Sequence, residues 1–292
     1  MSYRLRLEEP VPDALRAVAA QQLEAALRSL TDGLREDPVT AVHDARKSLK
    51  KTRSLLRLAR PGMPAGAYRE ENWALRDIAR SLSSARDADA LIEVVDDIAG
   101  RYVGRLPEAV FAALREQLVG SASSSTEGGA DAVIEAAIAD LRSALDRTTT
   151  WPLDGCDRDT LGAGITRAYR RGRTALRAIE AEPSVEALHE WRKRVKDLWY
   201  HYRLLRNAWP GPLKALAGEC SLLSDLLGDD HDLALLAEHV SDAELLDLVA
   251  ARRAELQTDA AALGRRLYAE KPDAFRTRID VLLQAQRPEH VD

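Results

Sequence analysis

Apolar residues recur every three to four positions along most of this chain, the spacing that places them on one side of an α-helix. Pro, Gly, Ser, Thr and Asp interrupt this pattern where helices commonly begin or end. The pattern predicts an all-α protein, with helices over 11–36, 39–60, 65–84, 87–119 and 130–147 in the first half and over 158–181, 184–208, 211–227, 231–240, 242–269 and 272–286 in the second.

Two of these helices carry matching sequences. VHDARKSLKKTRSLLRL (42–58) aligns with LHEWRKRVKDLWYHYRL (188–204) at an offset of 146, and LSSARDADAL (82–91) aligns with LGDDHDLALL (227–236) at an offset of 145. Two colinear matches predict an internal duplication: two helical bundles, residues 1–150 and 151–292, related by a pseudo-twofold and together forming one domain. TTTWPLDGCD (148–157) is predicted to connect the halves, and SASSSTEGGA (121–130) to form a flexible loop within the first.

Basic residues follow one side of each matching helix, opposite its apolar side. The first basic stripe consists of His43, Arg46, Lys47, Lys50, Arg53 and Arg57, and the second of His189, Arg192, Lys193, Lys196 and Arg203. An arginine stripe of Arg167, Arg170, Arg173 and Arg177 precedes the second, and Arg69, Arg76 and Arg80 form a weaker one. Like charges one turn apart destabilise a helix. A single stripe is commonly a solvated helix face, but its repetition in the same register favours a polyanion ligand.

The overall charge conceals this segregation. The net charge is −5, yet windows 43–60, 165–177 and 189–206 hold 18 of the 42 Lys and Arg residues and only three acids, Asp44, Glu190 and Asp197. These windows sum to +15, which leaves −20 for the rest of the chain. Local field rather than net charge determines which ligands bind. The sequence therefore predicts a basic surface on an acidic body.

Other features narrow the class of protein. The chain has no apolar run long enough to span a membrane, no signal-peptide pattern, and only two cysteines, Cys156 and Cys220, without CxxC spacing, so we expect a cytoplasmic protein. No phosphate-binding loop, GxSxG or HExxH motif occurs, and we expect neither catalysis nor a cofactor. Asp229, Asp230, His231 and Asp232, and also Asp87 with Asp89, suggest either a metal site or helix capping and inter-helix pairing. Their position after a predicted helix end favours capping and inter-helix pairing.

The pattern [VL]-H-x-x-R-K-x-x-K, present at 42–50 and 188–196, resembles the CHAD family, named for a conserved histidine in an α-helical domain. AYRRGRTAL (168–176), LSSARDADAL and LLGDDHDLALL add to the resemblance, which covers about residues 5–285. It implies two helical bundles in pseudo-twofold arrangement and a basic central surface that binds long-chain inorganic polyphosphate, in some members at polyphosphate granules. Carried over to this chain, the binding residues are His43, Arg46, Lys47, Lys50, His189, Arg192, Lys193 and Lys196.

The chain departs from a symmetric site. Lys51 and Arg53 of the first copy correspond to Asp197 and Trp199 in the second, and the arginine stripe has no counterpart in the first half. The two halves are therefore expected to contribute unequally. No triphosphate-metabolising domain accompanies the resemblance, which indicates a stand-alone copy.

The expected function is non-enzymatic binding of polyphosphate. The alternatives are a helical scaffold that docks an acidic protein segment through the same basic face, or nucleic-acid binding. Nucleic acid is disfavoured because no aromatic residue interleaves the first stripe, although Trp199 and Tyr200 border the second. The histidines either contact the ligand or are helix-face residues paired with a carboxylate. Oligomeric state, the preferred chain length and the process served stay open.

Overall fold

The computed structural model describes residues 3–82, 87–123 and 130–285. For residues 87–90, 121–123 and 130 it describes the backbone alone. In these ranges the chain forms eleven α-helices and three short 3-10 helices and contains no β-strand, which confirms the all-α prediction. The elements are α1 (Val11–Thr31), η1 (Gly33–Arg35), α2 (Pro38–Ala59), η2 (Arg60–Gly62), α3 (Ala65–Ser81), α4 (Asp87–Arg101), α5 (Glu108–Ser123), α6 (Ala130–Thr148), α7 (Arg158–Ala181), α8 (Val185–Leu204), η3 (Arg206–Ala208), α9 (Pro210–Ala237), α10 (Ala243–Leu267) and α11 (Pro272–Gln284).

The two helices with the matching sequences begin where the capping residues predict. Asp37 accepts a hydrogen bond from the Thr40 amide at 3.1 Å and caps α2, and Ser184 accepts one from the Ala187 amide at 3.1 Å and caps α8. Each cap satisfies a backbone donor that has no partner inside the helix. Both helices end in a 3-10 turn, η2 and η3.

The prediction of a single helix over 87–119 is wrong, because the chain turns between α4 and α5. Gly104 has a φ of +78°, a conformation that favours glycine, and Pro107 immediately precedes α5. The break allows α5 to fold back against α4. Apolar periodicity continues on both sides of the break, and for that reason it concealed the turn.

The predicted break near 228–230 is also wrong. One continuous helix, α9, replaces the two helices predicted over 211–227 and 231–240. Gly228 is buried within it, and Asp230 is buried instead of capping a new helix. A single glycine inside a helix costs about 1 kcal/mol, which the packing of a long buried helix readily overrides.

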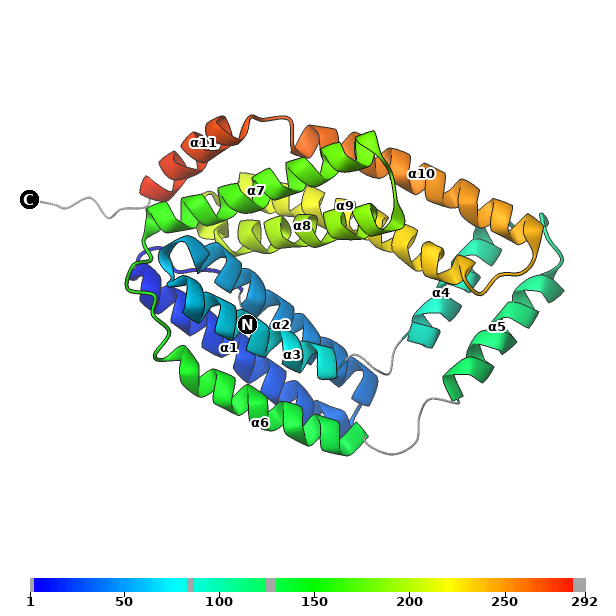
Figure 1. The fold of residues 1–292 in the computed structure, drawn as a ribbon, viewed down its shortest axis with the longest axis horizontal. Helices are drawn as coiled ribbons and strands as arrows, with labels where there is room; N and C mark the ends of the chain where they lie inside the picture. The colour runs from blue at the N-terminus through cyan, green and yellow to red at the C-terminus, as the bar shows by residue number, and fades with distance from the viewer. Residues whose placement is uncertain (1–2, 83–86, 124–129, 286–292) are drawn as a thin grey trace, which may run out of the picture.

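Figure 1 shows how the elements are arranged. Helices α1, α2, α3 and α6 pack together, α7 to α11 form the other large group, and α2 contacts both α7 and α8 where the groups meet. The larger apolar core contains buried residues from both halves, among them Leu49, Leu56, Leu161 and Val195. A smaller core joins α4 and α5 to α9 and α10.

The predicted boundary between the two halves, near residue 150, falls in the segment between α6 and α7. The division of the chain into two halves stays a prediction. The predicted loop at 121–130 lies largely outside the described residues, as does the Ser83–Arg86 part of the LSSARDADAL motif; the side chains of Asp87 and Asp89 are likewise not described. No helix within the described ranges has the length and apolar character required to cross a membrane.

Candidate anion-binding surface

Helices α2 and α8 are buried on the side that the sequence predicts. Leu49 and Leu56 of α2, and Trp191, Val195 and Leu198 of α8, are fully buried in the larger core. Because each helix also packs against the other, the basic stripes do not face open solvent along their whole length. His43, Lys47 and Lys50 are exposed, whereas Arg53, Arg57 and Lys196 are partly buried.

The two stripes meet at a set of residues that we term the lysine–histidine group, composed of Lys50, His189, Arg192, Lys196 and His231. Its centre is Lys196. The pKa of Lys196 is lowered to about 8, first by burial and then by the charges of Arg192 and Lys50, while Asp225 and Asp232 of α9 act in the opposite direction. Lys196 is thus a partly buried lysine that has cations and acids on either side.

Arg192 reaches α9 because Gly228 has no side chain. The Arg192 Nε donates a hydrogen bond to the Ser224 carbonyl at 3.3 Å. A Cβ at Gly228 would lie 2.6 Å from Arg192 Nη2, so any other residue there would displace the guanidinium. Gly228 therefore provides space for a basic side chain, which explains a glycine in the middle of α9 better than the helix end that the sequence suggested.

His189 is adjacent to a second histidine. The rings of His189 and His231 lie 4.4 Å apart between centroids, at 40° to each other, and the Nδ1 atom of each is buried without a hydrogen-bond partner among the described residues. Burial lowers the pKa of His189, and His231 and Lys193 lower it further. The structure thus places His189 among cations and beside a second imidazole.

Further along the same two helices lies a small pocket, which we term the arginine pocket. It is lined by residues of α2, η2, α3, α7 and α8: Arg57, Arg60, Tyr68, Gly164, Arg167, Ala168, Arg171, Asp197 and His201. Gly164 brings α7 directly against the backbone of α2, since a Cβ there would collide with the Leu58 carbonyl oxygen. This close approach places Arg167 and Arg171 opposite Arg57 and Arg60.

One carboxylate faces these arginines. Asp197, whose side chain is 11% exposed, accepts from Arg57 Nη1 at 2.9 Å and lies 3.6 Å from Arg194 Nη1. Burial lowers the pKa of Arg194, and Arg171 adds to this. For Arg167 burial again lowers the pKa, followed by the effect of Arg60 and Arg171. The lining of the pocket holds four arginines, Arg57, Arg60, Arg167 and Arg171, and one carboxylate, Asp197, so cations outnumber anions there.

Two further groups border the pocket. The pKa of Arg53 falls to about 10, chiefly through burial and then through Arg57, and its Nε donates to Asn72 at 3.2 Å. His201 is fully buried, with Nε2 3.0 Å from the Ser54 carbonyl oxygen, and burial lowers its pKa to about 4. His201 is therefore neutral at neutral pH and links α8 to α2 without adding charge.

A third basic contact lies between Lys51 and Arg203. Lys51 Nζ and Arg203 Cζ each lie 5.7 Å from the centre of the Tyr3 ring. Arg203 also lies 5.0 Å from the Trp199 ring, which stacks against Tyr200 at 4.8 Å. Burial lowers the pKa of Lys51, and Arg203 lowers it further.

Several predicted site residues lie outside these groups. Arg173 is near Tyr169, on the side of α7 that faces Glu270, and Arg170 and Arg177 are exposed. The arginine stripe therefore divides, and only Arg167 of its members lines the pocket. The remaining predicted residues have other surroundings. Lys47 lies 3.9 Å from Asp44, Lys193 pairs with Glu190, and Arg76 pairs with Asp77. Arg80 and His43 are exposed, and Arg46 is partly buried.

Five residues at these contacts were absent from the predicted site: Lys51, Arg60, Arg171, Arg194 and His231. Arg171 and Arg167 are one helical turn apart, a signal in AYRRGRTAL that the neighbouring Arg170 obscured. His231 follows the predicted helix break, and the error about that break hid its position opposite His189. Arg60 lies just beyond the last residue of α2.

The acids at 229–232 do not cap a helix. Asp230 accepts from Arg253 Nε at 3.0 Å and from Gln257 Nε2 at 2.7 Å, so it joins α9 to α10. The expected inter-helix pairing is thus confirmed for Asp230, and the expected capping is wrong. Within the described ranges, no three His, Cys, Asp or Glu side chains gather as potential metal ligands.

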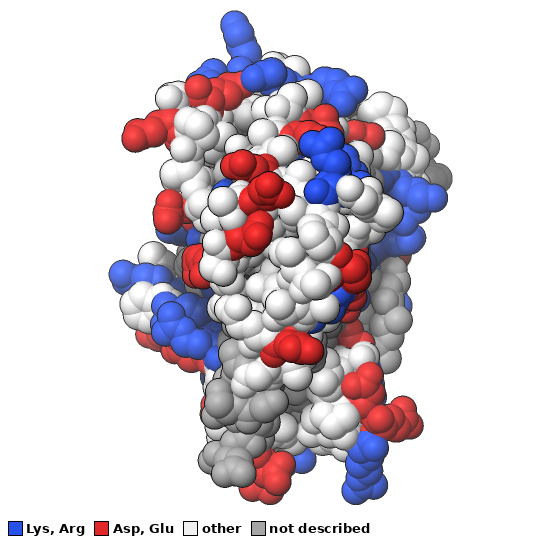
Figure 2. Space-filling model, turned by 90° about the vertical axis from the view of Figure 1, so that its right-hand side faces the viewer, with Lys and Arg blue, Asp and Glu red and all other residues white. Residues whose placement is uncertain are grey.

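The remaining surface differs from these basic groups. Figure 2 shows the side of the molecule at the right of Figure 1, over α4, α5 and the adjoining end of α10, where acidic and basic side chains are interspersed. Ion pairs on these helices include Arg101 with Glu255 at 2.8 Å and Arg115 with Asp96 at 2.6 Å. Charges of both signs neutralise each other there.

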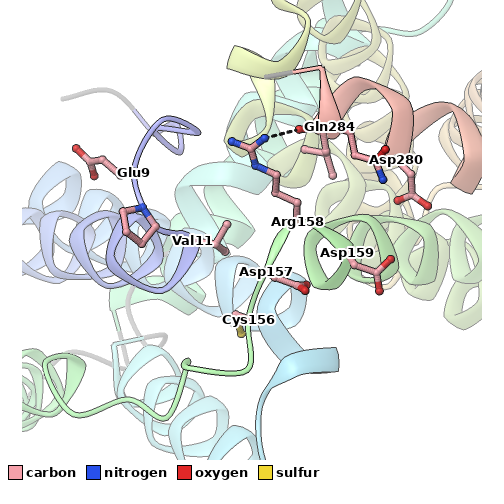
Figure 3. A pocket seen from close by; sticks show the side chains of 10 residues that line it. Glu9, Val11, Cys156, Asp157, Arg158, Asp159, Asp280 and Gln284 are labelled. Carbon is pink, nitrogen blue, oxygen red and sulfur yellow. Dashed lines mark hydrogen bonds between the residues drawn. The ribbon is translucent and has the colours of Figure 1, made fainter. Parts of the chain in front are cut away.

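A larger pocket of about 350 Å³ lies where α7 begins and α11 ends (Figure 3). Its lining includes Glu9, Asp157, Asp159 and Asp280, and its central cation, Arg158, already donates to the Leu7 and Leu283 carbonyls. Acids that surround an arginine already bound to backbone carbonyls make this pocket unsuitable for a polyanion.

The structure thus shows an all-helical chain in which two basic helices are in contact, with several guanidinium groups gathered between them. The CHAD domain model matches residues 17–241, and the chain belongs to this family. Two uncharacterised Mycobacterium tuberculosis proteins, MT2285 of strain CDC 1551 and Rv2226 of strain H37Rv, are each 30% identical over 253 residues. The match covers 80% of this chain and 46% of each relative, so the chain spans about half their length.

One solved structure supports the fold. PptA from Streptomyces chartreusis superposes with a TM-score of 0.58 at 17% identity, covering 90% of this chain and 100% of that chain. The CHAD domain from the plant Ricinus communis gives a TM-score of 0.47 at 18% identity, covering 98% and 94%. At these identities, the similarity to PptA shows the fold alone.

Proposed function

We propose that this chain binds long-chain inorganic polyphosphate without chemical turnover. The binding surface is formed by α2 and α8 together with the adjoining faces of α7 and α9. The observation that carries this proposal is the excess of cations where α2 and α8 meet: Lys50, Arg192 and Lys196 lie near one another, and four arginines line the arginine pocket against one carboxylate. A polyanion would relieve that repulsion.

Polyphosphate fits this surface better than nucleic acid does. It is a flexible chain of closely spaced charges that basic side chains bind through charge-assisted hydrogen bonds and counterion release. Single-stranded nucleic acid also requires exposed aromatic rings for base stacking. Trp199 is the partly exposed ring beside these groups, and it is already in contact with Arg203 and Tyr200. Membership of the CHAD family supports the same ligand, because that is the function the family resemblance implies.

We further propose that the site arose by duplication and has two unequal halves. At the offset of 146, Lys51 corresponds to Asp197 and Arg57 to Arg203. In the structure the partners are exchanged. Arg57 pairs with Asp197, the counterpart of Lys51, and Lys51 lies near Arg203, the counterpart of Arg57. This exchange is what a pseudo-twofold axis between α2 and α8 would produce. The inequality follows because one pair is neutralised and the other is not.

A titration over a series of polyphosphate lengths at two salt concentrations tests the function. Affinity should increase with chain length until the chain spans both the lysine–histidine group and the arginine pocket. Arg192→Gln should weaken binding. It should also reduce the salt slope, which is the slope of log affinity against log salt concentration, by about one, as expected for one lost phosphate contact. Arg101→Gln is the matched control, because it removes an arginine from the mixed-charge surface of α4.

Competing outcomes have distinct signatures. Displacement of polyphosphate by single-stranded RNA at equal phosphate concentration would indicate a nucleic-acid site. Binding that ignores chain length would indicate a scaffold for acidic protein segments. Release of orthophosphate from polyphosphate with Mg²⁺ would contradict the non-enzymatic proposal. A cytoplasmic location at polyphosphate granules is part of the proposal, and microscopy of a fluorescent fusion in cells with and without polyphosphate tests it.

A further inference from the structure

Asp197 differs from every other acid near the basic surface. Its side chain lies inside the arginine pocket, is 11% exposed, and pairs with Arg57 and Arg194 from two helices. Asp44 and Glu190, the other two acids in the basic windows, are 50% and 42% exposed and pair with lysine or arginine on their own helix. Asp197 is therefore the one buried carboxylate among these three.

The charge of Asp197 neutralises only part of the pocket. Among the described residues, no carboxylate forms an ion pair with Arg60, Arg167 or Arg171. Arg60 instead lies over the Tyr68 ring at 4.8 Å. The pocket thus has one wall where Arg57 is paired with Asp197, which Arg194 also contacts from outside the lining, and another where three arginines lack an acid. An anion entering the pocket meets both the unpaired arginines and the carboxylate.

The corresponding position in the other half shows what the pocket would be without the acid. Lys51 occupies that position in the sequence and lies close to Arg203, and among the described residues neither side chain forms an ion pair with a carboxylate. Both positions accommodate the same fold of α2 against α8, so helix packing alone does not require an acid. Asp197 accordingly does more than hold the helices together, because it lowers the positive charge of the pocket.

We propose that Asp197 is an internal competing anion that lowers the affinity of the arginine pocket for a phosphate unit. This inference rests on the proposed function and concerns the strength of binding at one part of that surface. The carboxylate oxygens of Asp197 and the oxygens of a phosphate are alternative acceptors for the same guanidinium donors of Arg57 and Arg194. A phosphate chain must displace the carboxylate from these donors or bind beside a like charge.

The test compares tripolyphosphate binding to the wild-type protein and to Asp197→Asn, a change inside the pocket. Asparagine preserves the size of the side chain and an oxygen that can accept from Arg57, while it removes the charge. We expect binding to tighten by about tenfold, the effect of a like charge that changes a neighbouring pKa by about one. The salt slope should become steeper, because the pocket gains one net positive charge.

Glu190→Gln is the matched control. It removes a negative charge from the same helix and from the same partner, Arg194, but at a more exposed position outside the pocket. Its effect should stay within about threefold, as for an exposed ion pair. Tighter binding in Asp197→Asn than in Glu190→Gln supports the inference. Equal or weaker binding would overturn it, because Asp197 would then position the arginines for the ligand.

A second variant covers the event that Asp197→Asn does not fold. Arg167→Gln combined with Arg171→Gln changes two exposed residues of α7 that lie on the unpaired wall. Tripolyphosphate should bind this double variant at least about tenfold more weakly, since each lost phosphate contact costs affinity. Unchanged binding would show that the pocket is not a phosphate site. Wild-type protein that binds no polyphosphate of any length would instead refute the proposed function itself.

Discussion

Replacing Lys196 with methionine should make the protein more stable and a weaker binder. Burial lowers the pKa of this lysine from 10.5 to about 8, with Arg192 and Lys50 adding to the effect. A change of one in a pKa corresponds to about 1.4 kcal/mol, so keeping Lys196 charged in the folded protein costs about 3 kcal/mol as an upper bound. Methionine keeps the length of the side chain and removes the charge. We expect a gain of about 1–3 kcal/mol in the free energy of unfolding at pH 7.

The pH dependence of that gain follows from proton linkage. The folded protein releases the Lys196 proton near pH 8, whereas the unfolded chain holds it to about pH 10.5. Between these values the unfolded state binds more protons, so wild-type stability rises with pH. The stability advantage of Lys196→Met should therefore be complete below pH 8 and decline between pH 8 and 10.5. Urea unfolding at a series of pH values measures it.

Binding should change in the opposite direction. A bound polyanion favours charged Lys196, so wild-type affinity should be unaffected by this group below pH 8 and fall above it. That fall should be absent in Lys196→Met, which should bind more weakly at pH 7. Lys214→Met, which changes an exposed lysine of α9 that belongs to neither basic group, provides the control. If Lys196→Met destabilises the protein, or if its effect on stability does not depend on pH, the assigned charge repulsion is wrong.

Three other substitutions separate the site from the scaffold. Gly228→Ala should leave the helical content unchanged but displace Arg192 and weaken binding, as circular dichroism and a polyphosphate titration would show together. Leu49→Ala should destabilise the protein by about 2–5 kcal/mol in urea, because Leu49 is fully buried, and affinity in the folded fraction should not change. Asp230→Ala should cost about 3–5 kcal/mol in the same assay, because it leaves Arg253 unpaired in a largely buried position.

The helical fold and the central helices could be predicted because their signals are local. N-caps at Asp37 and Ser184 and the apolar positions around Leu49 and Val195 depend on neighbours a few residues away. The effects of Gly104 and Gly228 on helix continuity were harder to predict. Glycine at 104 takes a positive φ and ends a helix, whereas glycine at 228 makes room for Arg192 inside one. Only the tertiary neighbour distinguishes the two cases.

The residues of the site were predicted less completely than the helices that carry them. A stripe on one helix says which side chains share a face, but not which of them meet a second helix. Arg170 and Arg171 are adjacent in the sequence, yet Arg171 lines the pocket and Arg170 does not. The difference arises because Gly164 sets how closely α7 approaches α2, and that distance selects the side chains that face inward.

Asp197 shows the limit of comparing the two halves by sequence alone. In the sequence alignment Asp197 corresponds to Lys51, which suggests that the second stripe has lost a basic residue. The natural conclusion is that the second half binds an anion more weakly. The structure places it instead opposite Arg57 of the first half, so the substitution changes the charge of a pocket built from both halves. A difference between the two matching segments therefore acts across the contact between α2 and α8. An effect of Asp197→Asn that Arg57→Gln abolishes in a double-mutant cycle would measure that coupling directly.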